Sequence, residues 1–258
     1  MQISPLIPRV ALVTGGARRL GRATALALAE AGFDIVLHYR DSAAEAEATA
    51  AAIRALGRRV VTLRAALERE AEVAGLVPAA VAALGPLGVL VNNASTFERD
   101  EWDNATRESW DHHLEPNLRA PFLLSQGFAA QLPEGAEGAI LNMLDQRVWS
   151  LTPHFVTYTV SKAGLWALTQ SLALALAPKR IRVNGIGPGP AIPSPRQTEE
   201  QFALQAASTP LGRGTSPAEV AGAILAILAL PAMTGQMIAL DGGQHLQWSP
   251  HRGQVLPE

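Results

Sequence analysis

The stretch VALVTGGARRLGRATALALAEAG, residues 10–32, decides the fold because it joins three patterns in one order. A short apolar run leads into a glycine-rich turn, and an alanine-rich segment with helical spacing follows. A strand, such a turn and a helix together aim backbone N–H groups and the positive helix end at a diphosphate. Gly15 would permit the tight turn, and Gly21 would let the helix start pack closely. Arg19 stands where a glycine would complete the familiar spacing, so the turn alone is a weak signal.

Further short runs rich in Val, Ile and Leu lie near residues 34, 59, 87, 138, 180 and 235, with alanine-rich helical segments between most of them. Strands that alternate with helices form a parallel sheet covered on both faces. We therefore predict a single α/β domain over residues 1–258, a Rossmann-type doubly wound parallel sheet with helices on both faces. The Pro-rich stretch within residues 188–212 follows a predicted strand. Because such sheets bind ligands beyond the carboxyl ends of their strands, we expect this stretch to form a substrate loop.

The composition excludes several classes of protein. With a formal net charge of -2 and a pI near 6.3, the chain has no basic field for nucleic acid or an acidic membrane surface, which favours a small-molecule partner. The chain has no cysteine, so it forms no disulfide and no cysteine metal site. The N-terminal stretch has no signal-peptide pattern, and the longest apolar runs are broken, so we expect a soluble, cytoplasmic protein.

The second apolar run ends in LHYRDS, which bears on the choice of cofactor. A site for NAD usually places an acidic residue there to bind the ribose 2′-hydroxyl. Here His38, Arg40 and Ser42, with Arg18 of the first turn, suit a 2′-phosphate through charge-assisted hydrogen bonds. Asp41 would disfavour a phosphate unless it points away, and solvated charges after an edge strand are the alternative. The pattern favours NADPH as the cofactor.

The segment YTVSKAGLWALTQSLALALAP holds the strongest chemical signal. Tyr158 and Lys162 are four residues apart on a predicted helix, so both project from one face. A lysine ammonium near a tyrosine favours phenolate, which would lower the tyrosine pKa and make it a usable proton donor. The chain has only two tyrosines, the other being Tyr39, and its lysines are Lys162 and Lys179, so this spacing is improbable by chance.

Polar residues follow other apolar runs. LVNNAS ends one run, where paired asparagines could bond the backbone and stabilise a cofactor-side turn. ILNMLDQ ends another with Asp145, thirteen residues before Tyr158. HLEPNLRAPF places Asn117 in the helix that lies between these two runs.

The ordered motifs VTGGARRLGRA, NNAS, YTVSK, RVNGIGPG and DGG resemble the short-chain dehydrogenase/reductase family over nearly the whole chain. The resemblance implies a helix-packed homotetramer or dimer. Two positions depart from the family pattern, since Arg19 replaces a glycine and Asp145 replaces the usual catalytic serine. A serine hydroxyl donates to a substrate carbonyl, whereas an ionised aspartate cannot and would repel a developing alkoxide. Asp145 suits a substrate that presents ring N–H or amino groups, or it relays a proton through Tyr158 to a ring nitrogen.

GARRLG, HYRDSAAEA, NNASTF and NMLD, with the tyrosine and lysine of YTVSK, resemble the pteridine reductases and the related bacterial dihydromonapterin and dihydrofolate reductases. This resemblance implies that Arg19 lies by the cofactor phosphates and the pterin. It implies that Phe97 stacks on the pterin and sandwiches it against the nicotinamide. Ser95 would contact cofactor phosphate or the pterin ring.

The same resemblance implies the catalytic roles. Asp145 and Tyr158 would form the proton-delivery pair, Lys162 would bind the nicotinamide ribose and tune the tyrosine, and Asn117 would support a water path to the lysine. The implied substrate-binding residues are Arg19, Ser95, Phe97, Asp145 and Tyr158. The implied cofactor-binding residues are Gly15, Arg18, Arg19, Leu20, Gly21, His38, Tyr39, Arg40, Ser42, Asn93, Ala94, Ser95, Tyr158, Lys162, Pro188 and Gly189.

These residues predict NADPH-dependent reduction of a pterin of the dihydropterin, dihydromonapterin or dihydrofolate type. One alternative is a family member that reduces another small carbonyl compound, and a second is a protein that binds NADP(H) without turnover. Ala66 stands where the family commonly has an aspartate for the adenine amino group, so that contact is lost or made by backbone alone.

The remaining histidines and tryptophans carry no ligand pattern. His112 and His113 stand in a polar helix without metal-ligand partners at suitable spacing, so we expect surface residues and no metal site. We expect the tryptophans to pack in the core or at subunit contacts, with Trp149 also in a position to wall the substrate pocket. These tryptophans are Trp102, Trp110, Trp149 and Trp166.

Overall fold

Seven parallel strands form one sheet in the computed structural model, which describes residues 2–194 and 197–247. The strand order is β3-β2-β1-β4-β5-β6-β7, and every neighbouring pair is parallel. Each predicted apolar run supplies one strand, so the predicted fold class is confirmed. The strands are β1 (Val10–Val13), β2 (Asp34–Tyr39), β3 (Val60–Arg64), β4 (Val89–Asn92), β5 (Gly138–Met143), β6 (Ile181–Pro188) and β7 (Met237–Leu240).

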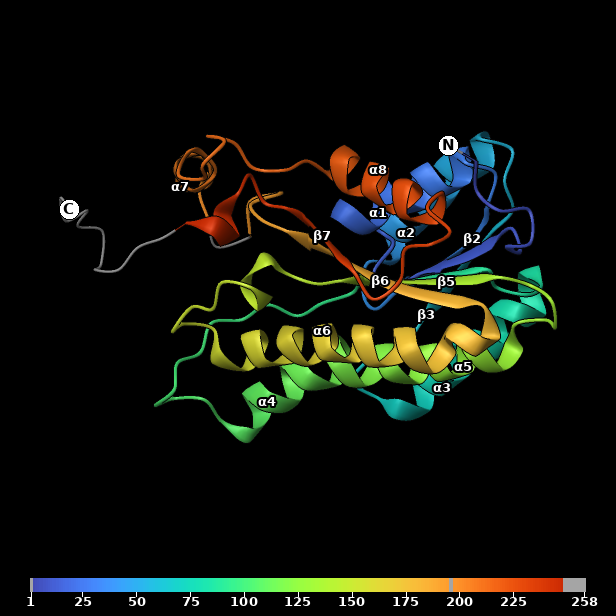
Figure 1. The fold of residues 1–258 in the computed structure, drawn as a ribbon, viewed down its shortest axis with the longest axis horizontal. Helices are drawn as coiled ribbons and strands as arrows, with labels where there is room; N and C mark the ends of the chain where they lie inside the picture. The colour runs from blue at the N-terminus through green and yellow to red at the C-terminus, as the bar shows by residue number, and fades with distance from the viewer. Residues whose placement is uncertain (1, 195–196, 248–258) are drawn as a thin grey trace.

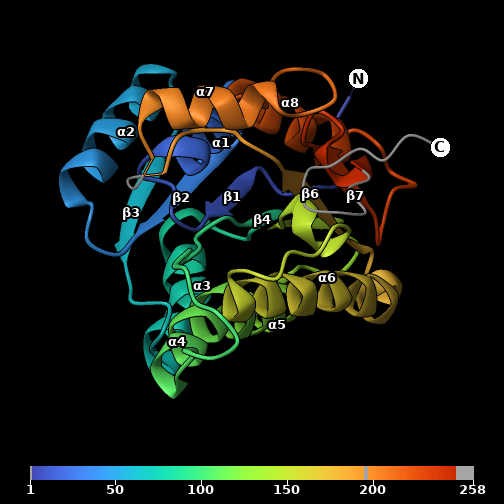
Figure 2. The same cartoon turned by 90° about the vertical axis from the view of Figure 1, so that its left-hand side faces the viewer.

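Two helix layers enclose the sheet, with α1, α2 and α8 on one face and α3 to α6 on the other (Figure 1). Figure 2, turned by 90°, shows the sheet between the two layers, with β3 toward the left and β7 toward the right. The helices are α1 (Arg19–Glu30), α2 (Ala43–Ala55), α3 (Glu70–Leu84), α4 (Arg107–Leu114), α5 (Ala120–Gln131), α6 (Val156–Leu176), α7 (Glu199–Ala207) and α8 (Pro217–Leu228). Short turns of other helix types are η1 (Glu115–Arg119, a π-helix), η2 (Gln146–Val148), η3 (Ala177–Lys179) and η4 (Gln244–Leu246).

The core lies on both faces of the sheet, and β1 shows why its sequence is apolar at every position. Ala11 and Val13 belong to the cluster packed against α1 and α8, whereas Val10 and Leu12 belong to the cluster packed against α3 and α5. Successive strand residues point to opposite faces, so a strand covered on both sides needs an apolar residue at each step. All four side chains are buried.

The strand order reverses direction between β1 and β4, and this positions the site. β1 is followed by β2 on one side, while β4 is followed by β5 on the other. Open α/β sheets bind ligands in the crevice at such a reversal, beyond the carboxyl ends of the strands. The segments that leave β1, β4, β5 and β6 therefore start from the same edge of the sheet.

The stretch at 188–212 is more ordered than the predicted loop. It contains α7, whose first turn is closed by a capping box between Thr198 and Gln201. The prolines that precede this helix favour a loop, whereas the Thr198–Gln201 spacing favours a helix start. Residues 195 and 196 of this stretch lie outside the described residues. In the part of the chain that the structure describes, no helix combines the length and apolarity needed to cross a bilayer.

Replacing Gly21 by Ala should disrupt the turn after β1. A Cβ at this position would lie 2.1 Å from the Gly15 carbonyl oxygen and 2.6 Å from Asn93 Nδ2, so backbone must move. We expect a loss of about 1–3 kcal/mol in the free energy of unfolding. Gly75→Ala is the matched control, because Gly75 lies within α3 and a Cβ there meets no atom within 4 Å. Urea denaturation should show the control at or above wild-type stability. Equal stability of Gly21→Ala and wild type would contradict this close approach.

Candidate active site

Hydrogen bonds tie the turn after β1 to the turn after β4. Thr14 Oγ1 accepts from the backbone N–H groups of Asn93 and Ala94 at 2.9 and 3.0 Å. Asn93 Nδ2 donates to the Thr14 and Gly15 carbonyl oxygens at 2.8 and 3.2 Å. The prediction that an asparagine of NNAS stabilises this turn is therefore confirmed for Asn93. Asn92 instead faces β5, where its Nδ2 donates to Asn142 Oδ1 at 2.8 Å.

The backbone of the glycine-rich turn explains both its glycines and its arginine. Gly15 has a φ of +61°, in the left-handed region that glycine adopts readily. Arg19, the first residue of α1, also has a positive φ of +54°. A glycine would be relaxed there, whereas a side chain with a Cβ costs free energy. The structure thus keeps the glycine-like backbone at residue 19 while placing a guanidinium at the helix start.

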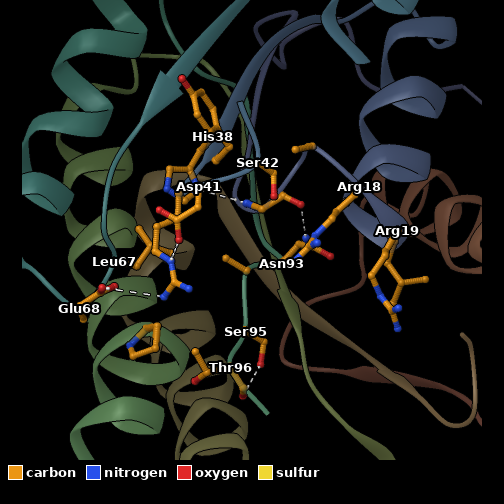
Figure 3. Close-up of a pocket in the computed structure, with 18 residues that line it drawn as sticks. Arg18, Arg19, His38, Asp41, Ser42, Leu67, Glu68, Asn93, Ser95 and Thr96 are labelled. Carbon is orange, nitrogen blue, oxygen red and sulfur yellow. Dashed lines mark hydrogen bonds and ion pairs between the residues drawn. The ribbon is translucent and has the colours of Figure 1, made fainter. Parts of the chain in front are cut away.

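A cavity of about 350 Å³ opens over this turn (Figure 3). It gathers most of the predicted cofactor-binding residues from segments that are distant in sequence. Leu67, Glu68, Thr96 and Pro116 also line it and were not predicted. The predicted residues that line it are Gly15, Arg18, Arg19, Leu20, Gly21, His38, Tyr39, Arg40, Ser42, Asn93, Ala94 and Ser95.

At one side of this cavity, Arg40 is held by acidic neighbours. Its Nε donates to Asp41 Oδ2 at 2.7 Å, and its Nη1 lies 3.9 Å from Glu68 Oε1. The Asp41 carboxylate therefore pairs with the guanidinium. Arg18 and Ser42 line the same cavity. The Ala66 N–H donates to Glu72 Oε2 at 2.7 Å. This N–H could donate to a ligand only if its hydrogen bond to Glu72 broke.

The predicted phosphate contact of His38 is wrong. Its side chain is 1% exposed, its Nδ1 accepts from the Gly15 N–H at 3.1 Å, and its Nε2 lies 3.0 Å from the Ala65 carbonyl oxygen. Because Nδ1 accepts, Nε2 carries the proton and donates to Ala65, so both ring nitrogens are used. Burial lowers the pKa of His38 and keeps the ring neutral. His38 stabilises the turn after β1 by accepting the Gly15 N–H, and its neutral ring offers no positive charge to a phosphate.

A second cavity, of about 300 Å³, adjoins the first and shares Arg19, Leu20, Asn93 and Ser95 with it. It contains every predicted residue that the first cavity lacks, with the exception of Asn117. Those residues are Phe97, Asp145, Tyr158, Lys162, Pro188 and Gly189. Residues that were not predicted also line it, among them Met143, Gln146, Arg147, Ile192, Phe202 and Gln244.

Tyr158 and Asp145 form a direct hydrogen bond in this second cavity. The phenol of Tyr158 is 6% exposed and donates to Asp145 Oδ2 at 2.9 Å. Burial, and then the negative charge of Asp145, raise the pKa of Tyr158 well above its ordinary value. The expectation that Lys162 lowers this pKa is wrong for the structure described here. The carboxylate lies closer to the phenol than the ammonium does, and both groups are removed from water.

Lys162 crosses from α6 to the end of β5. Its Nζ donates to the Met143 carbonyl oxygen at 2.8 Å and lies 5.8 Å from the Tyr158 ring centroid. The side chain is 3% exposed. Burial lowers its pKa to about 8, against the opposing influence of Asp145. The four-residue spacing on α6 is therefore confirmed as one face, although the ammonium bonds a backbone carbonyl.

An aromatic pair walls the second cavity. The Phe97 ring stacks on Phe155 at 4.7 Å between centroids and 7° between planes, and it meets the Tyr158 ring edge-on at 4.7 Å. Phe155, which was not predicted, precedes α6 with a φ of +58°. A bulky residue rarely adopts this conformation, and such outliers cluster at ligand sites.

Arg147 also belongs to the site without having been predicted. It lies in η2, two residues after Asp145, and its guanidinium carbon is 4.9 to 5.9 Å from the centroids of Phe97, Phe155 and Tyr158. Nothing in a sequence pattern distinguishes this arginine from a solvated one, because its aromatic partners come from two other segments, the one after β4 and the start of α6.

Arg19 contacts the stretch after β6. Its Nη1 donates to the Pro193 carbonyl oxygen at 2.9 Å, and its Nη2 donates to the Ile192 carbonyl oxygen at 3.2 Å. The guanidinium therefore joins the glycine-rich turn to the 188–212 stretch and lines both cavities.

Asn117 is the predicted residue that lies behind the cavities. It sits in the π-helix η1, and its side chain exchanges hydrogen bonds with the Thr96 backbone at 2.9 and 3.0 Å. Its Nδ2 also donates to Ser161 Oγ at 3.1 Å. Asn117 thereby ties the segment after β4 to α6. Single-turn π-helices inside longer helices often occur at functional sites.

The prediction that His112 and His113 lie at the surface is correct for His112, which is exposed, and wrong for His113. His113 is fully buried, its Nε2 accepts from the Glu98 N–H at 3.0 Å, and its Nδ1 lies 2.7 Å from Thr157 Oγ1. Thr157 in turn donates to the buried Asp100. This polar network joins α4 and α6 to the segment that carries Phe97. Within residues 2–194 and 197–247, no group of three or more His, Asp or Glu side chains could hold a metal ion.

Core packing of the tryptophans is confirmed for Trp166, whereas their subunit contacts stay a prediction. Trp166 packs against a small buried cluster, but Trp102 is 83% exposed and does not belong to the core of this chain. Trp149 is 44% exposed and packs edge-on against Trp166 and His245, at 6.2 and 5.1 Å.

Comparison with known proteins places the chain in a family. The family model described as Enoyl-(Acyl carrier protein) reductase matches residues 15–245. A 3-oxoacyl-[acyl-carrier-protein] reductase of Synechocystis sp. is 32% identical, over 93% of this chain and 98% of its own length. The chain belongs to the short-chain dehydrogenase/reductase family of oxidoreductases.

Within that family, two solved structures are more similar. FolM alternative dihydrofolate reductase 1 of Brucella suis, in complex with NADP, is 43% identical with a TM-score of 0.91, over 95% of this chain and 98% of that one. The Brucella canis protein of the same name, also complexed with NADP, is 42% identical with a TM-score of 0.92, over 96% and 98%. The resemblance to this branch is therefore confirmed.

Replacing Lys162 by Met should stabilise the protein at pH 7. Below about pH 8 the lysine is protonated in both the folded and the unfolded chain, so the cost of burying its charge is fully present. The lowered pKa corresponds to roughly 3 kcal/mol, which Lys162→Met would recover in the free energy of unfolding. Between about pH 8 and 10.5 only the unfolded chain keeps the proton, so wild-type stability rises and the difference shrinks. Urea denaturation across this range checks both statements, and a destabilised variant at pH 7 would contradict them.

Proposed function

We propose that this protein is an NADPH-dependent reductase of a pterin of the dihydropterin, dihydromonapterin or dihydrofolate type. One observation carries the proposal: the Tyr158 phenol donates to Asp145 in a cavity that adjoins the cavity of the glycine-rich turn. A carboxylate in this place accepts hydrogen bonds from amino and ring N–H groups, which pterins present. The similarity to two FolM dihydrofolate reductases supports the same substrate class.

NADP(H) is the cofactor, and the first cavity fits it. Gly21 leaves no room for a Cβ at the start of α1, where backbone N–H groups and the helix end favour a diphosphate. Arg18, Arg40 and Ser42 line the cavity and suit a 2′-phosphate. Lys162 and the Pro188–Gly189 segment line the adjoining cavity, where they would hold the nicotinamide ribose and ring. When bound, NADPH supplies a hydride from its nicotinamide to a ring carbon of the pterin.

The residues of the chain would orient the pterin and deliver the proton. Phe97 offers an aromatic surface for stacking, and Arg19 and Ser95 lie where the two cavities meet. Tyr158 would release its proton to the ring nitrogen beside the carbon that receives the hydride. Asp145 would orient the phenol and accept from the substrate N–H groups. Asn117 would act indirectly, by holding the segment after β4 against α6.

Reduction of another small carbonyl compound is the competing function, and the similarity to a 3-oxoacyl-[acyl-carrier-protein] reductase favours it. Asp145 argues against it, because an ionised carboxylate cannot donate to a carbonyl and repels an alkoxide. The 188–212 stretch is proposed as the substrate loop. The homotetramer or dimer and the cytoplasmic location stay predictions.

A screen of NADPH oxidation tests the proposal. The purified protein is assayed with dihydrobiopterin, dihydromonapterin, dihydrofolate, a 3-oxoacyl thioester and simple ketones and quinones. We expect turnover of at least one pterin, with kcat/KM above that of every carbonyl compound. Tyr158→Phe is the control, which should lose at least about 100-fold in kcat while it still binds NADPH. Turnover of carbonyl compounds without any pterin would overturn the proposed function, and unchanged turnover by Tyr158→Phe would remove Tyr158 from the mechanism.

A further inference from the structure

We propose that Arg147 is a positioning residue that acts as a second cation beside Lys162 and stabilises the negative charge left on Tyr158 by proton delivery. This inference rests on the proposed function only in taking Tyr158 as the proton donor. It does not depend on which substrate receives the proton.

The position of Arg147 relative to the donor pair is well defined. Its backbone N–H donates to Asp145 Oδ1 at 2.9 Å, and its Nη1 lies 3.9 Å from Asp145 Oδ2. The same Oδ2 accepts the Tyr158 hydroxyl. The guanidinium carbon lies 5.9 Å from the Tyr158 ring centroid, and the side chain is only 20% exposed. Its charge therefore acts on the donor pair with limited screening by water.

Aromatic rings hold the guanidinium in place. Its carbon lies 5.3 Å from the Phe97 centroid and 4.9 Å from the Phe155 centroid. A planar guanidinium is attracted to such ring faces. The left-handed backbone of Phe155 places its ring on Phe97, so a strained residue contributes to this arrangement. A charge that is already in place when the proton leaves needs no reorganisation during the reaction.

The charge balance at Tyr158 shows why a second cation matters. When Tyr158 protonates a ring nitrogen, its O–H bond breaks, an N–H bond forms and a phenolate remains beside the Asp145 carboxylate. The groups that face Tyr158 are Asp145 and Arg147 after β5, Lys162 on its own helix, and the neighbouring His113 ring at 6.0 Å on α4. Burial lowers the pKa of His113, so this ring adds no positive charge near neutral pH. Two cations therefore balance two anions.

The two cations differ in how they respond to pH. Lys162 is fully buried with a pKa of about 8 and loses its charge in moderate alkali. An arginine keeps its charge throughout this range. Arg147 is therefore the cation that persists when Lys162 deprotonates, and its removal should make the reaction depend on Lys162 alone.

Kinetics of three variants test the role of Arg147 in the full-length enzyme with whichever substrate the screen identifies. We expect Arg147→Met to lower kcat roughly tenfold or more, with little change in KM for NADPH, and kcat to fall more steeply than wild type above about pH 8. Arg147→Lys should restore part of the rate. Arg99→Met is the matched control, because Arg99 also lies over Phe155, at 5.8 Å, but pairs with Glu101. It should keep the wild-type rate and pH profile.

A titration of Tyr158 tests the inference without any substrate. The chain has only two tyrosines, so Tyr39→Phe leaves Tyr158 alone. Incorporation of a fluorinated tyrosine makes the phenol more acidic, and ¹⁹F NMR follows its ionisation. Arg147→Met in this background should raise the midpoint by about one unit. An unchanged midpoint with an unchanged kcat profile would overturn the inference, whereas a shifted midpoint in a protein that turns over no pterin would overturn only the proposed function.

Discussion

The partly buried hydrogen bond between the Tyr158 hydroxyl and Asp145 is the interaction on which the site depends. It joins the start of α6 to the segment after β5, two elements that the parallel sheet brings to the same edge. A hydroxyl in place of Asp145 could donate to a substrate oxygen, whereas the carboxylate only accepts. The Asp145 carboxylate therefore favours substrates that donate hydrogen bonds. Because Tyr158 and Asp145 hold negative charge where little water reaches it, nearby cations are needed to stabilise that charge.

The supporting structure limits the movement of this pair. Lys162 bonds the Met143 carbonyl oxygen and so holds α6 against β5, while Asn117 holds the segment after β4 against α6. The buried network of His113, Thr157 and Asp100 fixes the same segment from its other end. Each of these contacts uses a buried polar group whose partners are satisfied within the protein, which favours one arrangement over its alternatives. The site is thus held by contacts among β5, the segment after β4, η1, α4 and α6 rather than by a single loop.

The sequence predicted what depends on local pattern. The apolar runs became strands because a doubly covered sheet requires apolar residues at each step, and the spacing of Tyr158 and Lys162 placed both on one helix face. Roles that depend on distant partners were missed: His38 meets Gly15 and Ala65, His113 meets Glu98 and Thr157, and Arg147 meets rings from separate segments. The tyrosine pKa was expected to shift in the wrong direction, because sequence spacing does not say whether the ammonium or the carboxylate lies closer to the phenol.

The central claim is that Asp145 selects a nitrogen heterocycle over a carbonyl compound. The most direct test is the ratio of kcat/KM for the preferred dihydropterin to kcat/KM for a ketone or 3-oxoacyl thioester, measured for wild type and Asp145→Ser at saturating NADPH. We expect the substitution to lower this ratio by at least about 100-fold, since it removes the acceptor for the heterocycle and supplies a donor for a carbonyl oxygen. A ratio that is unchanged or higher in Asp145→Ser would contradict the claim.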